Sequence, residues 1–125
     1  MTPVVFINCR ELPFLDDILA GRKTIETRTR DTLRSVAGQR VYLAETGHGR
    51  PVIRAVAVIG WGRKMDRIDW ECLRKRTCIP VGSRYDWQPD TRVKYGYTLF
   101  DVTPIIPFTP PEGVRHGRVW MEYNH

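Results

Sequence analysis

Three charged residues lie close together in the first quarter of this 125-residue chain: Lys23, Glu26 and Arg28. A lysine and an arginine can hold phosphate oxygens or the edge of a nucleobase, while a carboxylate between them orients both cations. The same trio also suits catalysis, because burial and neighbouring cations lower the pKa of a lysine until it acts as a base, and a carboxylate can relay the proton. The purely structural alternative is an ion pair that pins a helix to a sheet, but an exposed pair adds only about 0–1 kcal/mol.

Basic and aromatic residues elsewhere extend this candidate site. Arg22 and Arg30 flank the trio and would lengthen a basic track. Tyr85 and Trp87 lie in a polar, arginine-bearing stretch, where a ring either packs inward or stacks on a base for about 1–3 kcal/mol. We therefore expect nucleic-acid contacts from Arg22, Lys23, Glu26, Arg28, Arg30, Tyr85 and Trp87, and, if the chain is an enzyme, catalysis by Lys23, Glu26 and Thr24.

The overall charge points to the same class of partner. Lysine and arginine number 20 against 14 aspartate and glutamate residues, which gives a formal charge of +6 and a pI ≈ 9.6. A basic domain tends to bind phosphate-rich molecules, because neutralising phosphates releases counterions, although the excess is equally compatible with simple solubility. RNA, a nucleotide or a nucleoside is the expected partner, and a protein partner remains open.

The composition excludes several other classes. The hydrophobic fraction of 42% and charged fraction of 27% are ordinary for globular proteins, so we expect residues 1–125 to form one folded domain. No apolar run approaches 18 residues and the start lacks the features of a signal peptide, so we expect a soluble cytoplasmic protein without a membrane partner. The three cysteines, Cys9, Cys72 and Cys78, match no disulfide or zinc pattern; we expect all three to be buried, and no metal or cofactor.

The elements around the trio place it at a junction of helix and strand. Hydrophobic spacing over residues 12–19 predicts a short amphipathic helix that begins near Pro13 and ends before Gly21. Alternating residues over 24–29 predict a strand, and its period of two puts Glu26 and Arg28 on one face. A long side chain at the helix exit, such as Lys23, can swing back toward that face.

The rest of the chain reads as short strands with one more helix. An apolar run at 4–7 predicts a strand, and further strands are expected at 40–45, 52–61 (apolar on both faces), 95–106 (broken at Pro104) and 119–123. Trp61 and Trp120 are expected in the core. Asp66 suits the N-cap of a helix over 66–77, whereas 80–91 and 107–117 read as irregular. This pattern predicts a mixed α+β fold, a small β pseudo-barrel with two short helices.

The segment from Gly21 to Arg28 has the pattern G-x-K-x-x-E-x-R directly after a short amphipathic helix, and it resembles the ASCH domain family. The strand entry at 38–43 and the strand at 52–60 follow in the order that this family shows, and residues 117–120 agree more weakly. Residues 63–94 match nothing in the resemblance. The resemblance implies a PUA-like pseudo-barrel, a fold used in RNA recognition.

One subgroup of the family adds a second possibility. Residues 16–25 are similar to bacterial N4-acetylcytidine amidohydrolase, whose catalytic lysine falls on Lys23. Its catalytic threonine falls on Glu26, which is a departure, and Glu71 is the only suggestion for its downstream glutamate. The resemblance thus implies RNA or nucleotide binding first, and a small hydrolase of acylated cytidine or a ribonuclease second. A protein-interaction adaptor, suggested by the prolines at 107–111, is a third reading.

Overall fold

The computed structural model describes residues 2–110 and 120–123, the last four by their backbone. Strands alternate with two short helices along the chain. The elements are β1 (Thr2–Asn8), α1 (Phe14–Leu19), β2 (Ile25–Arg28), a 3-10 turn (Arg34–Val36), β3 (Arg40–Thr46), β4 (Val52–Ile59), β5 (Arg63–Met65), α2 (Arg67–Thr77), β6 (Lys94–Phe108) and β7 (Trp120–Tyr123).

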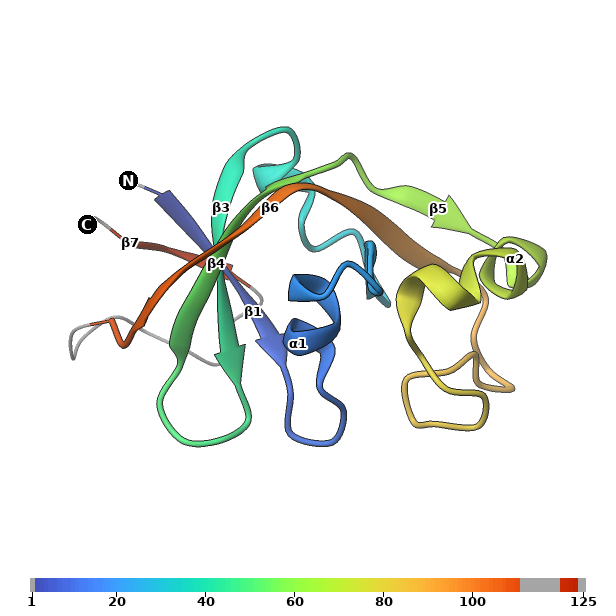
Figure 1. The fold of residues 1–125 in the computed structure, drawn as a ribbon. Coiled ribbons are helices and arrows are strands. Elements are labelled where there is room, and N and C mark those ends of the chain that lie inside the picture. The colour runs from blue at the N-terminus through green and yellow to red at the C-terminus, as the bar shows by residue number, and fades with distance from the viewer. Residues whose placement is uncertain (1, 111–119, 124–125) are drawn as a thin grey trace.

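The strands form one curled sheet in the order β2-β6-β4-β3-β1-β7, with β5 also paired to β6. β1 and β3 are parallel and the other pairs are antiparallel. The long strand β6 runs from the end that carries β5 and α2 toward the end where both termini lie (Figure 1). The predicted mixed α+β pseudo-barrel with two short helices is confirmed.

The curl brings β2 and β1, which are distant in the sheet order, close to each other. No backbone pairing joins these two strands in the described part of the chain. Instead, Arg28 Nη2 on β2 donates a hydrogen bond of 2.9 Å to the carbonyl oxygen of Phe6 on β1. We call this junction between β1 and β2 the seam, and it is the part of the barrel where a side chain replaces a strand ladder.

The buried residues form two clusters on opposite faces of β1: a larger one with Val5 and Ile7, and a smaller one with Val4 and Phe6. β4 contributes to both clusters, through Ala55 and Ile59 to the first and Ile53 to the second, as its apolar sequence predicts. α1 buries Phe14, Leu15 and Ile18 against the sheet. Because each large apolar side chain contributes about 1.5–3 kcal/mol when it is fully buried, these contacts hold the helix that precedes the candidate site.

The second helix begins as its sequence predicts. The Asp66 carboxylate accepts a hydrogen bond from the Asp69 amide at 2.8 Å, and the Asp69 carboxylate accepts one from the Asp66 amide at 3.2 Å. This reciprocal capping box fixes the first turn. The helix ends at Cys78, which adopts a left-handed conformation with φ 57°. Among the described residues, no helix is long and apolar enough to span a bilayer.

The prediction that Trp61 lies in the core is wrong, because its side chain is 71% exposed. Trp61 follows the end of β4 and sits between two glycines that pack tightly. A Cβ on Gly60 would come within 3.1 Å of the Phe100 ring, and one on Gly62 within 2.6 Å of Asp31. The backbone on both sides of Trp61 therefore packs closely against the protein, and the indole points into solvent. The side chain of Trp120 lies outside the described part.

The predicted burial of the cysteines holds only for Cys9. Cys72 is exposed because α2 turns Trp70 and Thr77 inward and leaves Cys72 on the solvent side. Cys78 is half-buried because it caps the end of that helix. Hydropathy alone could not show which side of α2 faces the core.

The predicted break at Pro104 is confirmed only as an irregularity, since β6 continues through Phe108. The register with β4 shifts twice: near Asp101, where φ is 51°, and again between Pro104 and Phe108. In the described residues this half of β6 pairs with β4 alone, so Pro104 has an open side where its missing N–H costs no ladder bond. Residues 107 and 108, expected to be irregular, belong to the strand, and 111–117 lie outside the described part.

Candidate functional site

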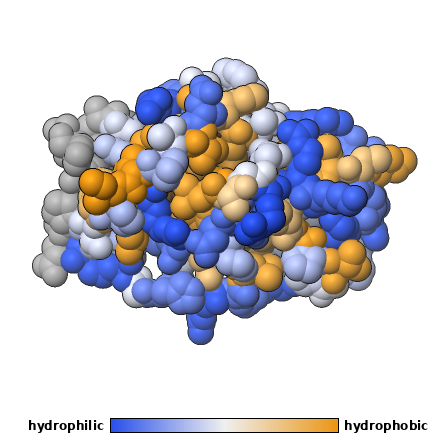
Figure 2. All heavy atoms as spheres, in the orientation of Figure 1, coloured by the Kyte–Doolittle hydropathy of each residue, from blue (hydrophilic) through white to orange (hydrophobic). Residues whose placement is uncertain are grey.

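A cavity of about 180 Å³ opens at the seam. Residues 6–8 of β1 and 26–28 of β2 line it, together with Phe14 and Lys23. The segment that follows α2 completes the lining with Ile79 and Tyr85. Four separate parts of the chain thus meet around one cavity, and the predicted trio lies among them. The face seen in Figure 2 is mostly hydrophilic, with hydrophobic residues concentrated over its middle.

Lys23 is the most deeply buried member of the trio, with 1% of its side chain exposed. The chain turns at Gly21, where φ is 79°, and the Lys23 side chain lies toward Glu26 on β2, as predicted. Its Nζ donates to the Thr77 carbonyl oxygen at 2.7 Å and lies 3.5 Å from Glu26 Oε1. It also lies 4.6 Å from the centre of the Phe14 ring. Burial lowers the pKa of Lys23, and the charge of Glu26 opposes that shift only in part.

Glu26 and Arg28 share one face of β2, as the period of two predicts. Arg28 Nη2 is 2.9 Å from Glu26 Oε2 and donates as well to the Phe6 carbonyl oxygen. The Nε of Arg28 is buried and has no hydrogen-bond partner among the described residues. The trio is a continuous cation–carboxylate–cation chain with one positive charge in excess when all three groups are ionised. The attraction within a buried ion pair is often smaller than the free energy needed to remove both charges from water. Stability alone is therefore a weak reason for this arrangement.

Two aromatic rings, those of Phe14 and Tyr85, form a wall of the cavity next to the charged residues. The rings of Phe14 and Tyr85 meet edge to face, with centroids 5.4 Å apart and an angle of 78° between their planes. The guanidinium carbon of Arg84 lies 5.2 Å from the Tyr85 ring. The sequence pattern indicated Tyr85 but not Phe14, whose place in a helix pattern indicated only a core role. Asn8 and Thr27 also line the cavity without having been predicted, although Thr27 lies between the predicted residues Glu26 and Arg28.

Two of the other predicted binding residues are engaged away from the cavity lining. Arg22 is largely exposed and pairs with Asp17 at 2.9 Å. Trp87 packs against Trp70, with ring centroids 6.2 Å apart. Arg30 is exposed and lies two residues beyond the end of β2.

The remaining catalytic suggestions also lie outside the lining. Thr24 accepts a hydrogen bond from Arg76 at 3.0 Å. Glu71, the suggestion for a downstream catalytic glutamate, is half-exposed on α2 and pairs with Arg67 and Arg74. Across the described residues, no group of three or more His, Cys, Asp and Glu side chains could hold a metal ion. The structure therefore brings together Lys23, Glu26, Arg28 and Tyr85.

Known proteins resemble this chain in fold. No family model and no curated protein matches the sequence. The solved structure of ASCH from Zymomonas mobilis matches with a TM-score of 0.71 and 20% identity, covering 86% of this chain and 73% of the other. Two single-substitution mutants of that protein match with TM-scores of 0.70, also at 20% identity and covering 86% of this chain; they are covered to 73% and 75%. At this identity the comparison shows a shared fold, which agrees with the fold that the motif implied.

Proposed function

We propose that this chain is a domain of the ASCH family and that it binds RNA by taking one nucleotide into the cavity at the seam. Two independent lines support the family: the motif from Gly21 to Arg28 in the sequence, and the fold shared with the Zymomonas mobilis ASCH structures. The observation that carries the function is that the buried Lys23–Glu26–Arg28 chain lines the same cavity as the rings of Phe14 and Tyr85.

The size of the cavity supports a single base as the ligand. A cavity of roughly 150 Å³ with apolar walls is enough to hold benzene. At about 180 Å³ the cavity at the seam has room for the ring of one base and is too small for several stacked nucleotides. A base has polar edges and an apolar face, and the lining of the cavity offers both charged groups and the rings of Phe14 and Tyr85.

The charge of the site supports a partner that carries phosphate. Arg28 and Lys23 outnumber Glu26, and exposed Arg30 continues the positive charge just beyond β2. The whole chain carries +6. A base held in the cavity would leave its phosphate near this basic surface, where arginine can bind it in two-point fashion.

Binding of a short single-stranded RNA, measured by fluorescence anisotropy at low salt, tests the proposal. Arg28→Ala and Lys23→Met should each weaken binding by roughly 10- to 100-fold, which corresponds to the loss of about 1.5–3 kcal/mol from a charged hydrogen bond. The matched controls Arg40→Ala and Lys75→Met change exposed residues that do not line the cavity, and they should bind within about twofold of wild type. Circular dichroism melts establish the folded fraction of each variant. Absent binding, or equal losses in cavity variants and controls, would contradict the proposal.

Hydrolysis of an acylated nucleoside is a second candidate, favoured by the lowered pKa of Lys23 and its contact with Glu26. Water would attack the amide carbonyl, a C–O bond would form and the C–N bond would break. The proton lost by water would pass through Lys23 or Glu26 to the leaving amine, so that the products are a carboxylate and an amine. Release of cytidine and acetate from N4-acetylcytidine, abolished by Lys23→Met, would support this candidate. No turnover across a panel of acylated nucleosides would leave binding as the better account.

Cytoplasmic location and a role as a protein-interaction adaptor both stay predictions. The adaptor role rests on the prolines at 107–111, of which Pro107 belongs to β6 and Pro111 lies outside the described part. Neither adds to the argument for the cavity.

A further inference from the structure

The segment between α2 and β6 supplies part of the cavity although it lies in the region, 63–94, that the family resemblance does not cover. Its contribution is Ile79 and Tyr85. Such a stretch without regular structure would ordinarily be mobile, and a mobile wall would not define the shape of a cavity. The contacts that hold this segment therefore bear on what the cavity accepts.

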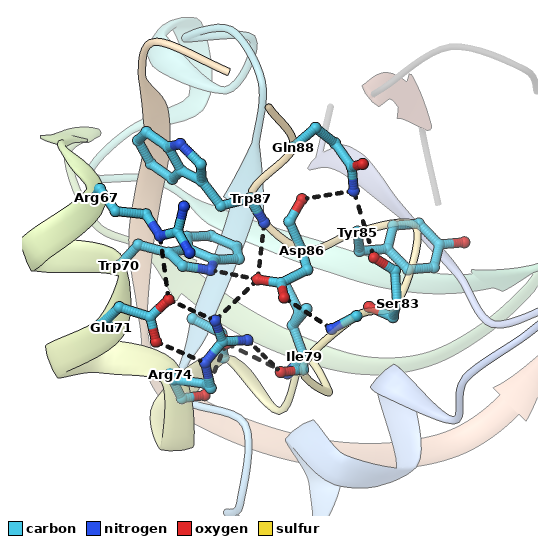
Figure 3. Close-up of polar contacts among 12 residues, drawn as sticks. Arg67, Trp70, Glu71, Arg74, Ile79, Ser83, Tyr85, Asp86, Trp87 and Gln88 are labelled. Carbon is cyan, nitrogen blue, oxygen red and sulfur yellow. Dashed lines mark hydrogen bonds and ion pairs between the residues drawn. The ribbon is translucent and has the colours of Figure 1, made fainter. Parts of the chain in front are cut away.

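Asp86 is the centre of these contacts (Figure 3). It is 8% exposed, and its carboxylate accepts four hydrogen bonds. Oδ1 accepts from Trp70 Nε1 at 2.8 Å, from Arg74 Nη2 at 2.9 Å and from the Trp87 amide at 2.7 Å, and Oδ2 accepts from the Gly82 amide at 2.8 Å. Burial alone would raise the pKa of Asp86, but these donors outweigh it and hold the pKa below its ordinary value. The carboxylate thus ties the segment to α2.

Lys94 ties the same segment to β6 from the other side. It is the first residue of that strand and is 5% exposed. Its Nζ donates to the carbonyl oxygen of Tyr85 and, at 3.3 Å, to that of Asp86, and it lies 4.4 Å from the centre of a Trp70 ring. Burial lowers the pKa of Lys94, and the charge of Asp86 opposes that shift. A buried lysine that is costly to desolvate is therefore used to hold the backbone of one cavity residue.

The Tyr85 ring itself takes no part in this network. In Figure 3 it points away from Trp70 and Arg74. It meets Phe14 at 5.4 Å and lines the cavity. The network holds the backbone at Tyr85 and leaves the ring free to line the cavity that also contains the charged trio.

We propose that Tyr85 determines specificity in the cavity and that Asp86 and Lys94 are its positioning residues, so that the cavity favours a single-ring base over a fused double-ring base. The inference rests on the proposed function, because it names which bases that site takes. The volume carries the size preference: a cavity of roughly 150 Å³ holds one six-membered ring. About 180 Å³ adds room for little more than the exocyclic groups. A second fused ring would exceed this volume and extend past the lining residues, so it would make fewer contacts with the Tyr85 ring.

The test is the ratio of two affinities, those for short uridine and adenosine oligonucleotides, measured by anisotropy. Wild type should favour uridine, and Tyr85→Ala, Lys94→Met and Asp86→Asn should each lower this preference by roughly tenfold, the scale of one well-fitted apolar contact. Tyr85→Phe keeps the ring and should keep the preference. Lys64→Met and Asp90→Asn make the matched changes at exposed residues and should also keep it.

The ratio separates positioning from stability, because partial unfolding weakens both affinities equally. If Lys94→Met does not fold, Tyr85→Ala, at a half-buried loop position, carries the test. RNA bound by wild type without a preference, or a preference unchanged in Tyr85→Ala, would overturn the inference while leaving the proposed function intact. A ratio changed by Tyr85→Ala but unchanged in folded Lys94→Met and Asp86→Asn would overturn their positioning role. No RNA binding by wild type would mean instead that the proposed function fails.

Discussion

Each carboxylate oxygen of Glu26 has its own cation. Oε1 lies 3.5 Å from Lys23 Nζ and Oε2 lies 2.9 Å from Arg28 Nη2. The residue therefore links the two cations that the proposal assigns to RNA. In binding it orients them and reduces the positive charge of the cavity, whereas in hydrolysis it would relay a proton.

Glu26→Gln separates these roles because it removes the charge and nearly keeps the shape. The binding account expects RNA affinity to stay similar or become tighter, since the cavity becomes more positive. A proton relay would instead lose activity by about 10²–10⁴-fold with substrate binding kept. A purely structural ion pair would show mainly in a lower melting temperature. Asp90→Asn, at an exposed site, is the control, and a clear loss of RNA affinity in folded Glu26→Gln alone would contradict the account.

The lowered pKa of Lys23 predicts a pH dependence of stability. Burial favours the neutral amine in the folded state, while the unfolded chain keeps its proton up to about pH 10.4. Between the folded pKa and that value the unfolded state binds more protons, so the free energy of unfolding rises with pH. Wild type should therefore gain stability relative to Lys23→Met as pH rises toward about 10. Urea unfolding of both proteins at several pH values measures this. A relative loss would mean that the attraction of Glu26 exceeds the cost of burial.

At the scale of elements, local patterns predicted much of what the structure shows. Pro13 and Gly21 bracket α1, and Asp66 caps α2, because these residues act on their own neighbours. The common face of Glu26 and Arg28 followed from strand geometry alone. The contact of Lys23 with Thr77 joins residues 54 positions apart, and only the curl of the sheet creates it.

The predictions that were wrong, and the site residues that were not predicted, depend on contacts between residues that are far apart in the sequence. The outward position of Trp61 depends on how tightly Gly60 packs against Phe100, and no local pattern contains that information. The role of the segment after α2 was equally hidden, because Asp86 acts through partners on a helix and a loop. Phe14 and Asn8 reach the cavity only because β1 and β2 meet at the seam.

The capping box of α2 should have a measurable effect on the whole chain. Asp66→Ala removes a side-chain acceptor for the Asp69 amide and should lower the free energy of unfolding by about 0.5–2 kcal/mol. The loss should appear in urea unfolding because α2 carries Trp70 and Arg74, which hold Asp86. Asp90→Ala, at an exposed position, is the control. Equal stability of the two variants would show that a hydrogen bond from water to the Asp69 amide replaces the capping box without loss of stability.

At the scale of the molecule, the proposed function gives the basic excess and the seam separate roles. The charge of +6 would attract RNA from a distance, and the cavity would give one nucleotide a defined place. The first effect should be sensitive to salt and the second to the shape of the base. Separating them experimentally separates general attraction from recognition.

Salt dependence measures the first effect. Log affinity for single-stranded RNA should fall linearly with log salt concentration, with a slope of about −0.7 for each phosphate neutralised. Arg28→Ala should make the slope shallower by about 0.7 if this arginine binds one phosphate. Glu71→Gln, which removes a charge on α2, should leave the number of bound phosphates the same. Affinity that does not change with salt would exclude phosphate contacts as its source.

A crystal structure of the protein with a short single-stranded RNA tests the central claim most directly. The account predicts one base inside the cavity at the seam, in contact with the Tyr85 ring and within hydrogen-bond distance of Lys23 or Glu26. It also predicts a phosphate near Arg28 or Arg30. RNA bound on another surface, with the cavity at the seam unchanged and empty, would contradict the account.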